Sequence, residues 1–209
     1  MNSYHDYVIK DGNFIGKFDE MYRNCDDPWH QLSDGTIFSL GRTNVINIIK
    51  KMVCDTKTKS KVLEIGCGLG GFSYRLVNEL GLPVTGLDIS EAAIDRAKSS
   101  YKEEGLDFKV ENIVNISRYK EYDIIVLSEL LWYILDDLEQ VLDCIKDAFS
   151  GSHLIILQSF YREGLQQYGK DFFTNIDELN AYIPFCCISK IVIDPIEGSS
   201  YETVSVYKI

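Results

Sequence analysis

Short, strongly apolar runs alternate along this chain with segments in which apolar residues recur every three or four positions. The runs are typical of strands buried in a parallel sheet, and they occur at 61–65, 84–88, 108–110, 122–128 and 154–157. The periodic segments are typical of amphipathic helices, and they occur at 45–52, 72–80, 90–101, 136–149 and 174–183. Two further strand patterns follow at 188–193 and 202–207. The whole pattern predicts an α/β fold with helices on both faces of a mostly parallel sheet.

The first forty residues carry a different pattern. Residues 7–16 resemble a short hairpin whose turn is Asp11-Gly12, a pair that favours a primed turn. Residues 18–23 predict one or two helical turns. We expect a single domain, in which an N-terminal segment at 1–43 precedes a core at 44–209.

The composition is that of a globular protein with an acidic surface. The 209 residues carry a formal net charge of −11, which argues against nucleic acid or an anionic membrane as a partner. No apolar run approaches the roughly 18 residues of a membrane span, and no secretory leader pattern is present, so we expect a cytoplasmic protein. The six cysteines lack the spacing of a zinc site, and we expect no metal. The adjacent pair Cys186 and Cys187 is interpreted as buried free thiols.

A glycine-rich turn follows the strand at 61–65. Glycine accepts positive φ and lets a ligand approach the backbone closely, so this turn predicts a nucleotide site. Gly66, Gly68 and Gly71 also satisfy the dinucleotide pattern G-x-G-x-x-G. However, Glu64 ends the strand, where its carboxylate would repel a pyrophosphate and attract a sulfonium or an ammonium. A tight turn that binds no ligand is the alternative.

The run Glu64-x-Gly66-x-Gly68-x-Gly70 resembles the first motif of class I methyltransferases that use S-adenosylmethionine. Asp88 ends the next strand, where a carboxylate accepts hydrogen bonds from both hydroxyls of a ribose. From about residue 45 onward, the order of motifs is similar to that of this family. The resemblance implies a Rossmann-like, seven-stranded sheet of order 3-2-1-4-5-7-6 with the last strand antiparallel. It also implies S-adenosylmethionine as cofactor and S-adenosylhomocysteine as product.

The resemblance assigns the cofactor site residue by residue. Ile89 is expected on the adenine face, Asn112 takes the position of the family's usual aspartate, and Arg42 is a candidate for the cofactor carboxylate. A solvated arginine is the other interpretation of Arg42. The full set of predicted cofactor residues is Glu64, Gly66, Cys67, Gly68, Gly70, Asp88, Ile89, Asn112, Ile113, Ser128 and Arg42.

The acceptor is expected to be a small molecule bound between an N-terminal lid, which the family commonly has, and the loop at 159–175. Glu129, at the carboxyl end of the fourth strand, is the candidate general base, and His30 is a second one. The candidate acceptor-binding residues are Trp29, His30, Tyr133, Tyr161, Arg162, Tyr168 and Lys170. Each of these side chains also has an ordinary interpretation, as a packing residue or a solvated loop residue.

The sequence leaves three functions open. Asp26-Asp27-Pro28-Trp29 and the segment 127–133 are similar to nodulation-type N-methyltransferases, which implies a methyl transfer to N or O of a small acceptor such as a sugar or surface-glycan precursor. The glycine pattern alone would also suit an NAD(P)-dependent oxidoreductase. A protein that binds S-adenosylmethionine without catalysis, as a partner of another protein, is the third.

Overall fold

A seven-stranded sheet forms the centre of the computed structural model, which describes residues 6–10, 13–30, 39–54 and 60–209. The strands lie in the order β5-β4-β3-β6-β7-β9-β8. Their bounds are β3 Val62–Ile65, β4 Val84–Asp88, β5 Leu106–Val110, β6 Ile124–Ser128, β7 His153–Tyr161, β8 Cys186–Ile193 and β9 Ser200–Lys208. Because β9 runs antiparallel to both β7 and β8, the predicted order 3-2-1-4-5-7-6 with an antiparallel last strand is confirmed.

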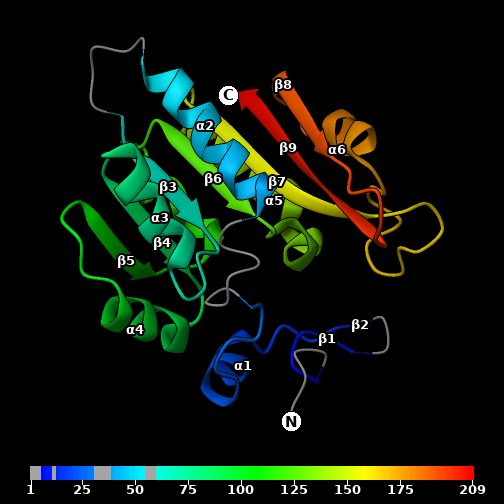
Figure 1. The fold of residues 1–209 in the computed structure, drawn as a ribbon, viewed down its shortest axis with the longest axis horizontal. Helices are drawn as coiled ribbons and strands as arrows, with labels where there is room; N and C mark the ends of the chain where they lie inside the picture. The colour runs from blue at the N-terminus through cyan, green and yellow to red at the C-terminus, as the bar shows by residue number, and fades with distance from the viewer. Residues whose placement is uncertain (1–5, 11–12, 31–38, 55–59) are drawn as a thin grey trace.

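Helices cover both faces of this sheet because its strand residues point alternately to either side (Figure 1). Helices α2 (Leu40–Cys54) and α3 (Gly71–Leu80) pack on Val62 and the residues that share its face. Helices α5 (Leu138–Ala148) and α6 (Ile176–Tyr182) pack on the opposite face, which includes Leu63. Helix α4 (Glu91–Ser100) connects β4 to β5, with Ser90 as its predicted N-cap accepting from the Ala93 amide at 3.1 Å.

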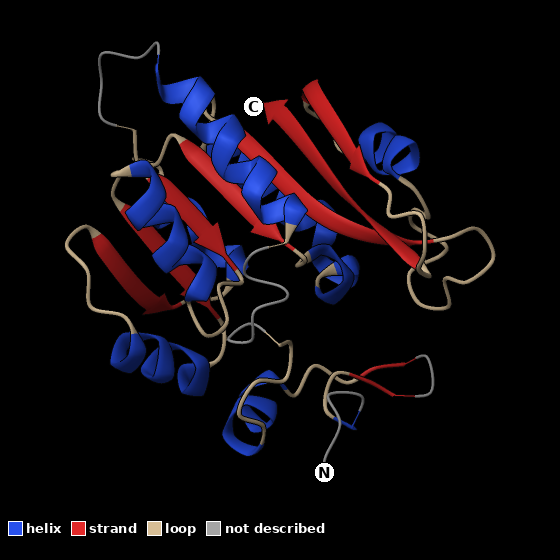
Figure 2. Cartoon of the chain, in the orientation of Figure 1, coloured by secondary structure: helices blue, strands red, loops and turns tan. Residues whose placement is uncertain are grey.

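The N-terminal segment lies beyond the carboxyl ends of the central strands (Figures 1 and 2). Strands β1 (Ile9–Lys10) and β2 (Asn13–Phe14) pair antiparallel, and α1 (Phe18–Asn24) follows them. The predicted hairpin and helical turns are therefore confirmed. The predicted turn at 11–12 falls outside the described residues.

Two predicted helix starts are corrected. Helix α6 begins at Ile176, and its cap is Asn175, whose side chain accepts hydrogen bonds from the amides of Asp177 and Glu178. Thr174, the first residue of the predicted helical segment, lies outside the helix and donates its hydroxyl to the Glu178 carboxylate at 2.9 Å. Ahead of α5, residues 135–137 form a 3-10 turn because their amide hydrogen bonds span three residues.

The adjacent cysteines also differ from expectation. Cys186 and Cys187 are exposed, because they begin β8, the edge strand of the sheet. Among the described residues, no helix is both long and apolar enough to cross a membrane.

Candidate active site

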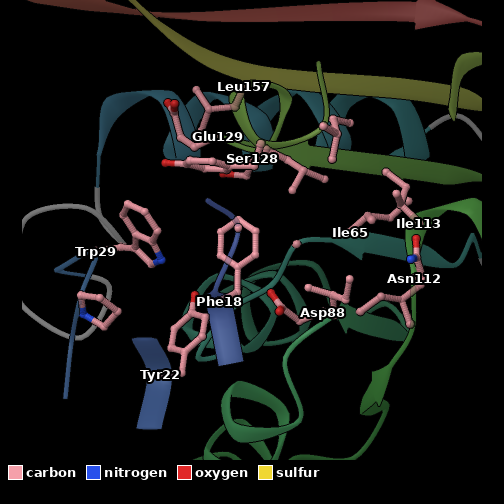
Figure 3. A pocket seen from close by; sticks show the side chains of 18 of the residues that line it. Phe18, Tyr22, Trp29, Ile65, Asp88, Asn112, Ile113, Ser128, Glu129 and Leu157 are labelled. Atoms are coloured by element: carbon pink, nitrogen blue, oxygen red, sulfur yellow. The ribbon is translucent and has the colours of Figure 1, made fainter. Parts of the chain in front are cut away.

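A cavity of about 610 Å³ opens at the carboxyl ends of β3, β4 and β6, and the N-terminal segment forms its other wall. Figure 3 shows Trp29 and Glu129 toward one end of this cavity and Asn112 and Ile113 toward the other. Parallel strands end together at this edge of the sheet, so residues from distant parts of the chain meet here. The predicted residues that line the cavity are Trp29, His30, Arg42, Gly66, Asp88, Ile89, Asn112, Ile113, Ser128, Glu129 and Tyr133.

The glycine turn adopts backbone angles that other residues avoid. Gly66, Gly68 and Gly70 have φ of 79°, 52° and 79°. The Gly66 and Cys67 amides donate to the Leu87 carbonyl at 2.8 and 2.9 Å. These amide groups are therefore engaged within the protein.

Asp88 lies where the turn meets β4. Its carboxylate accepts from the Gly68 amide at 2.8 Å and from the Ser90 amide at 2.9 Å. Burial raises the pKa of Asp88, while these backbone hydrogen bonds oppose that rise. Because a carboxylate has about four acceptor positions, Asp88 keeps acceptor capacity beyond these backbone hydrogen bonds, and it lines the cavity.

Glu64 lies behind the cavity wall instead of in it. Its side chain is only 2% exposed and accepts a hydrogen bond from the Ser73 hydroxyl of α3. Burial, the largest cause, raises the pKa of Glu64 to about 7. The cavity therefore has, one residue layer away, a carboxyl group that gains or loses its proton near neutral pH.

The raised pKa of Glu64 makes the stability of the protein depend on pH. The folded state holds this proton more tightly than the unfolded state, so the stabilisation is complete below about pH 4.5 and is lost as the pH rises through about 7. We expect wild type to lose about 3 kcal/mol of unfolding free energy between pH 4.5 and 8 relative to Glu64→Gln. Urea unfolding of both proteins at the two pH values measures this loss. An equal difference between the proteins at both pH values would contradict it.

Glu129 follows β6 directly and has a left-handed backbone with φ of 57°. Its carboxylate accepts from the Ser159 hydroxyl at 2.7 Å, the Ser159 amide at 3.1 Å and the Gln158 side-chain amide at 3.3 Å. Burial raises the pKa of Glu129. The structure thus holds this carboxylate in one orientation at the cavity wall.

Arg42 enters the cavity from α2 and is 8% exposed. Its guanidinium lies 5.4 Å from the centre of the Phe72 ring, and its charge opposes the rise in pKa of both Glu64 and Glu129. The amide of the preceding residue, Gly41, donates to Glu202 of β9 at 2.9 Å. The structure therefore places Arg42 in a buried electrostatic environment and not on the solvated surface.

Two further predicted cofactor residues lie toward different ends of the cavity, Asn112 at the far end and Ser128 beside Glu129 (Figure 3). Asn112 uses its side-chain oxygen to cap a 3-10 helix at Ile113–Tyr119, accepting from the Val114 amide at 3.1 Å. One acceptor position of that oxygen remains for a ligand. Ser128 is 7% exposed, and its hydroxyl has no hydrogen-bond partner among the described residues. Four predicted residues, Glu64, Cys67, Gly68 and Gly70, support the turn without lining the cavity.

The predicted acceptor loop lies largely outside the cavity. Arg162 forms an ion pair with Asp194 at 2.7 Å and donates to the carbonyl of Gly198 at 3.0 Å, which corrects its assignment as a cavity residue. Strand β7 pairs with the end of β6 at Leu157 and then continues four residues to Tyr161. These residues carry the chain about 13 Å beyond the strand ends. Tyr161, Tyr168 and Lys170 do not line the cavity either, although the Tyr168 ring stacks with that of Phe14, which does, at 6.4 Å between centroids.

Several cavity residues were not identified from the sequence. Phe18 and Tyr22 lie four positions apart on α1, a spacing that places both on one face of a helix. The cavity is also lined by Phe14 in the hairpin, Ser159 on β7, Glu202 on β9, Glu111 after β5 and Asp137 before α5. Nothing in the local sequence distinguishes Glu202, because its position depends on how β9 pairs.

Hydrogen bonds join α1 to α4 and to Ser90 before it. These contacts hold the N-terminal segment over the cavity. Asp19 accepts from the Ser90 hydroxyl at 3.0 Å and from the Ala92 amide at 2.9 Å. In return, Arg96 of α4 donates to the carbonyls of Tyr22 and Cys25, each at 3.0 Å. These contacts place Phe18 and Tyr22 against the cavity.

A model of the methyltransferase domain family matches residues 56–198, which is more than half of the chain. The chain belongs to this family. Within it, the chain is 28% identical to a putative methyltransferase of Geobacillus sp. (strain WCH70) over 132 residues, covering 60% of this chain and 53% of the relative. It is 26% identical to norajmaline N-methyltransferase of Rauvolfia serpentina over 113 residues, covering 51% and 38%. It is 32% identical to ubiquinone biosynthesis O-methyltransferase of Histophilus somni over 95 residues, covering 42% and 40%.

The matched part of this methyltransferase domain thus spans about half or less of these relatives. Among solved structures, N-methyltransferase NodS from Bradyrhizobium japonicum, in complex with S-adenosylhomocysteine, has a TM-score of 0.68 at 18% identity, covering 91% of this chain and 97% of that one. Phosphoethanolamine N-methyltransferase 2 of Haemonchus contortus has a TM-score of 0.66 at 15% identity, covering 91% and 59%. These likenesses show a shared fold.

The fastening of α1 gives a further prediction for this methyltransferase domain. Arg96→Ala removes the donors to the carbonyls at the end of α1, so α1 should open more often. We expect amide hydrogen exchange in α1 to rise at least about tenfold, while the rate in β6 stays unchanged. Lys98→Ala, an exposed change on the same helix, is the control. Unchanged exchange in α1 of Arg96→Ala would show that these contacts do not hold it.

Proposed function

We propose that this methyltransferase domain transfers a methyl group from S-adenosylmethionine to nitrogen or oxygen of a small-molecule acceptor. The observation that carries the proposal is the Asp88 carboxylate, which ends β4 beside the glycine turn and keeps acceptor capacity toward the cavity. A carboxylate in this position is suited to accept hydrogen bonds from the two hydroxyls of a ribose. The family assignment supports the methyl transfer.

The described residues fit the cofactor. Ile89 and Ile113 supply apolar surface for an adenine, and Asn112 supplies an acceptor for its amino group. A Cβ on Gly66 would lie 2.7 Å from the Leu130 side chain. Glycine at this position therefore lets Leu130 pack closely against the turn at the cavity wall. Ser128 offers a buried hydroxyl, and Arg42 offers a guanidinium for a carboxylate.

The hydrogen bonds of the glycine turn argue against a pyrophosphate. A dinucleotide site turns backbone amides toward the phosphates. Here the amides of Gly66 and Cys67 donate to the Leu87 carbonyl, and the Gly68 amide donates to Asp88. The buried carboxyl of Glu64 behind the turn would add repulsion.

The cofactor supplies an electrophilic methyl group on a sulfonium, so the protein's main task is alignment. The aromatic residues of the N-terminal segment exclude water from the cavity. Glu129, fixed by Ser159 and Gln158, is the candidate to accept a proton from the acceptor, and its raised pKa brings it closer to neutral pH. His30 lines the same cavity and is the second candidate.

The acceptor class draws support from the relatives. The resemblance of residues 26–29 and 127–133 to nodulation-type N-methyltransferases is the basis for proposing a sugar or surface-glycan precursor. The fold is shared with N-methyltransferase NodS. Relatives are named as N- and O-methyltransferases, so both acceptor atoms belong to the proposal. The net charge of −11 favours a small acceptor in the cytoplasm over a nucleic acid.

Calorimetric titration with S-adenosylmethionine, S-adenosylhomocysteine and NADH tests the proposal. We expect micromolar binding of both adenosyl ligands and no binding of NADH. Binding of NADH alone would overturn it in favour of an oxidoreductase. Tight binding of S-adenosylmethionine without transfer to any amine, hydroxyl or sugar acceptor would favour a non-catalytic partner protein.

A further inference from the structure

The acceptor end of the cavity carries an excess of negative charge. Two lining carboxylates lie toward Asn112, where the nucleoside is proposed to bind. Asp88 ends β4, and Glu111 follows β5 directly. The other lining carboxylates are Glu129 directly after β6, Glu202 in β9 and Asp137 in the turn before α5. The described lining residues include one arginine, Arg42, and no lysine.

Three of these charged groups interact with one another, namely Glu129, Glu202 and Arg42. Glu202 raises the pKa of Glu129, whereas Arg42 lowers it, so the three groups lie within electrostatic range. The three lining carboxylates Glu129, Glu202 and Asp137 exceed the single Arg42 guanidinium by two negative charges. The methionine part of the proposed cofactor brings an ammonium, a carboxylate and a sulfonium, which together compensate one of them. The remaining charge favours a cation, and an anionic acceptor would be repelled.

Aromatic side chains line the same cavity as these carboxylates. The Tyr133 ring lies 5.4 Å from the Trp29 ring and 5.6 Å from the Phe18 ring, measured between centroids. Trp29 also forms a side-chain hydrogen bond with Tyr22, which orients the indole. Aromatic faces beside a carboxylate attract an organic cation through the ring quadrupole. An alcohol or an acid gains nothing comparable from such a wall.

We infer that the acceptor is an amine that enters as an ammonium ion and is held between the Glu129 carboxylate and the aromatic rings of Trp29, Tyr133 and Phe18. This inference rests on the proposed methyl transfer and names its substrate class. Glu129 is suited to the role because three hydrogen bonds fix it and about one acceptor position remains. In the transfer, an ammonium proton moves to a Glu129 oxygen and the nitrogen lone pair forms the N–C bond. The C–S bond breaks with its electron pair left on sulfur.

Two matched series of probes separate charge from shape. The first is glucosamine, glucose and glucuronate, and the second is tyramine, tyrosol and 4-hydroxyphenylacetate. Each is titrated into the protein saturated with S-adenosylhomocysteine, and methyl transfer from S-adenosylmethionine is followed in parallel by mass spectrometry. We expect the amine of at least one series to bind at least about tenfold tighter than its neutral and anionic counterparts, and to be the member that is methylated.

Variants locate the effect. Glu129→Gln should weaken binding of that amine about tenfold and leave the neutral member unchanged. Glu121→Gln makes the same chemical change at an exposed position before β6, and should have no effect. Trp29→Leu should also weaken the amine more than the neutral member. Retained binding of S-adenosylhomocysteine shows that each variant is folded.

The outcomes distinguish this inference from the proposed function. If S-adenosylhomocysteine binds but no amine binds at millimolar concentration, or an alcohol or acid binds as tightly as its amine, the inference is wrong and the proposed function stands. An unchanged amine preference in Glu129→Gln would also overturn the assigned role of Glu129. If S-adenosylhomocysteine itself does not bind, the proposed function fails.

Discussion

Replacing Asp88 by alanine is expected to weaken binding of S-adenosylmethionine by at least about 100-fold. The variant removes the carboxylate that lines the cavity, and each hydrogen bond from a ribose hydroxyl to a carboxylate contributes about 1.5–3 kcal/mol. It also leaves the amides of Gly68 and Ser90 without their partner, which loosens the glycine turn. Calorimetric titration of wild type and variant with S-adenosylhomocysteine measures the loss without interference from turnover.

Two further variants make this test specific. Asp88→Asn keeps one acceptor oxygen and a similar shape, so we expect an intermediate affinity. Asp143→Ala removes a carboxylate from the exposed side of α5 and should bind like wild type. Wild-type affinity in Asp88→Ala would show that the nucleoside binds elsewhere. It would also remove the observation on which the proposed function rests.

Gly70→Ala is expected to cost about 3 kcal/mol of unfolding free energy. Gly70 has φ of 79°, where a side chain is strained by about 1–2 kcal/mol. An added Cβ would also lie 2.6 Å from the Phe108 ring and 2.9 Å from Ala97. Because both neighbours are fully buried, they have little room to move, and overpacking adds about 1–3 kcal/mol.

Gly81→Ala is the matched control for the steric contribution. Gly81 has φ of 64°, but a Cβ there would meet nothing within 4 Å. We therefore expect it to cost only about 1 kcal/mol. Urea unfolding of the two variants and wild type gives the comparison. Equal losses at both glycines would show that the packing of Phe108 and Ala97 around the turn does not matter.

The parts of the molecule that could be predicted are those determined by neighbours in the sequence. Successive residues of a central strand contact the helices on opposite faces of the sheet, so both must be apolar, as in the run 124–127. The positive φ angles of the turn require glycine. Asp88 could be placed at the site because the carboxyl end of a parallel strand lies at the ligand edge of the sheet. Glu129 could be nominated for the same reason, and Trp29 and His30 from the N-terminal lid that the family commonly has. The structure brings all three to the same cavity.

The acceptor end of the cavity depends on contacts between residues that are distant in the sequence. Glu202 reaches the cavity because β9 pairs antiparallel with β7, and it contacts the amide of Gly41 across 161 positions of sequence. Arg162 was expected at the site, but the extension of β7 beyond β6 carries it to Asp194. The buried position of Glu64, and hence its pKa of about 7, results from α3 packing over the strand.

The sequence by itself therefore predicted the α/β pattern and the glycine turn, because hydrophobic period, glycine φ and strand-end position are local properties. The family resemblance added the strand order and the residues proposed to bind the nucleoside. Only the tertiary structure decided that Phe18 and Glu202 lie in the same cavity as Trp29, Tyr133 and Glu129, and that Arg162 does not. Their meeting depends on strand register, on the length of β7 and on the fastening of α1 to α4. These are long-range contacts, and no local pattern encodes them.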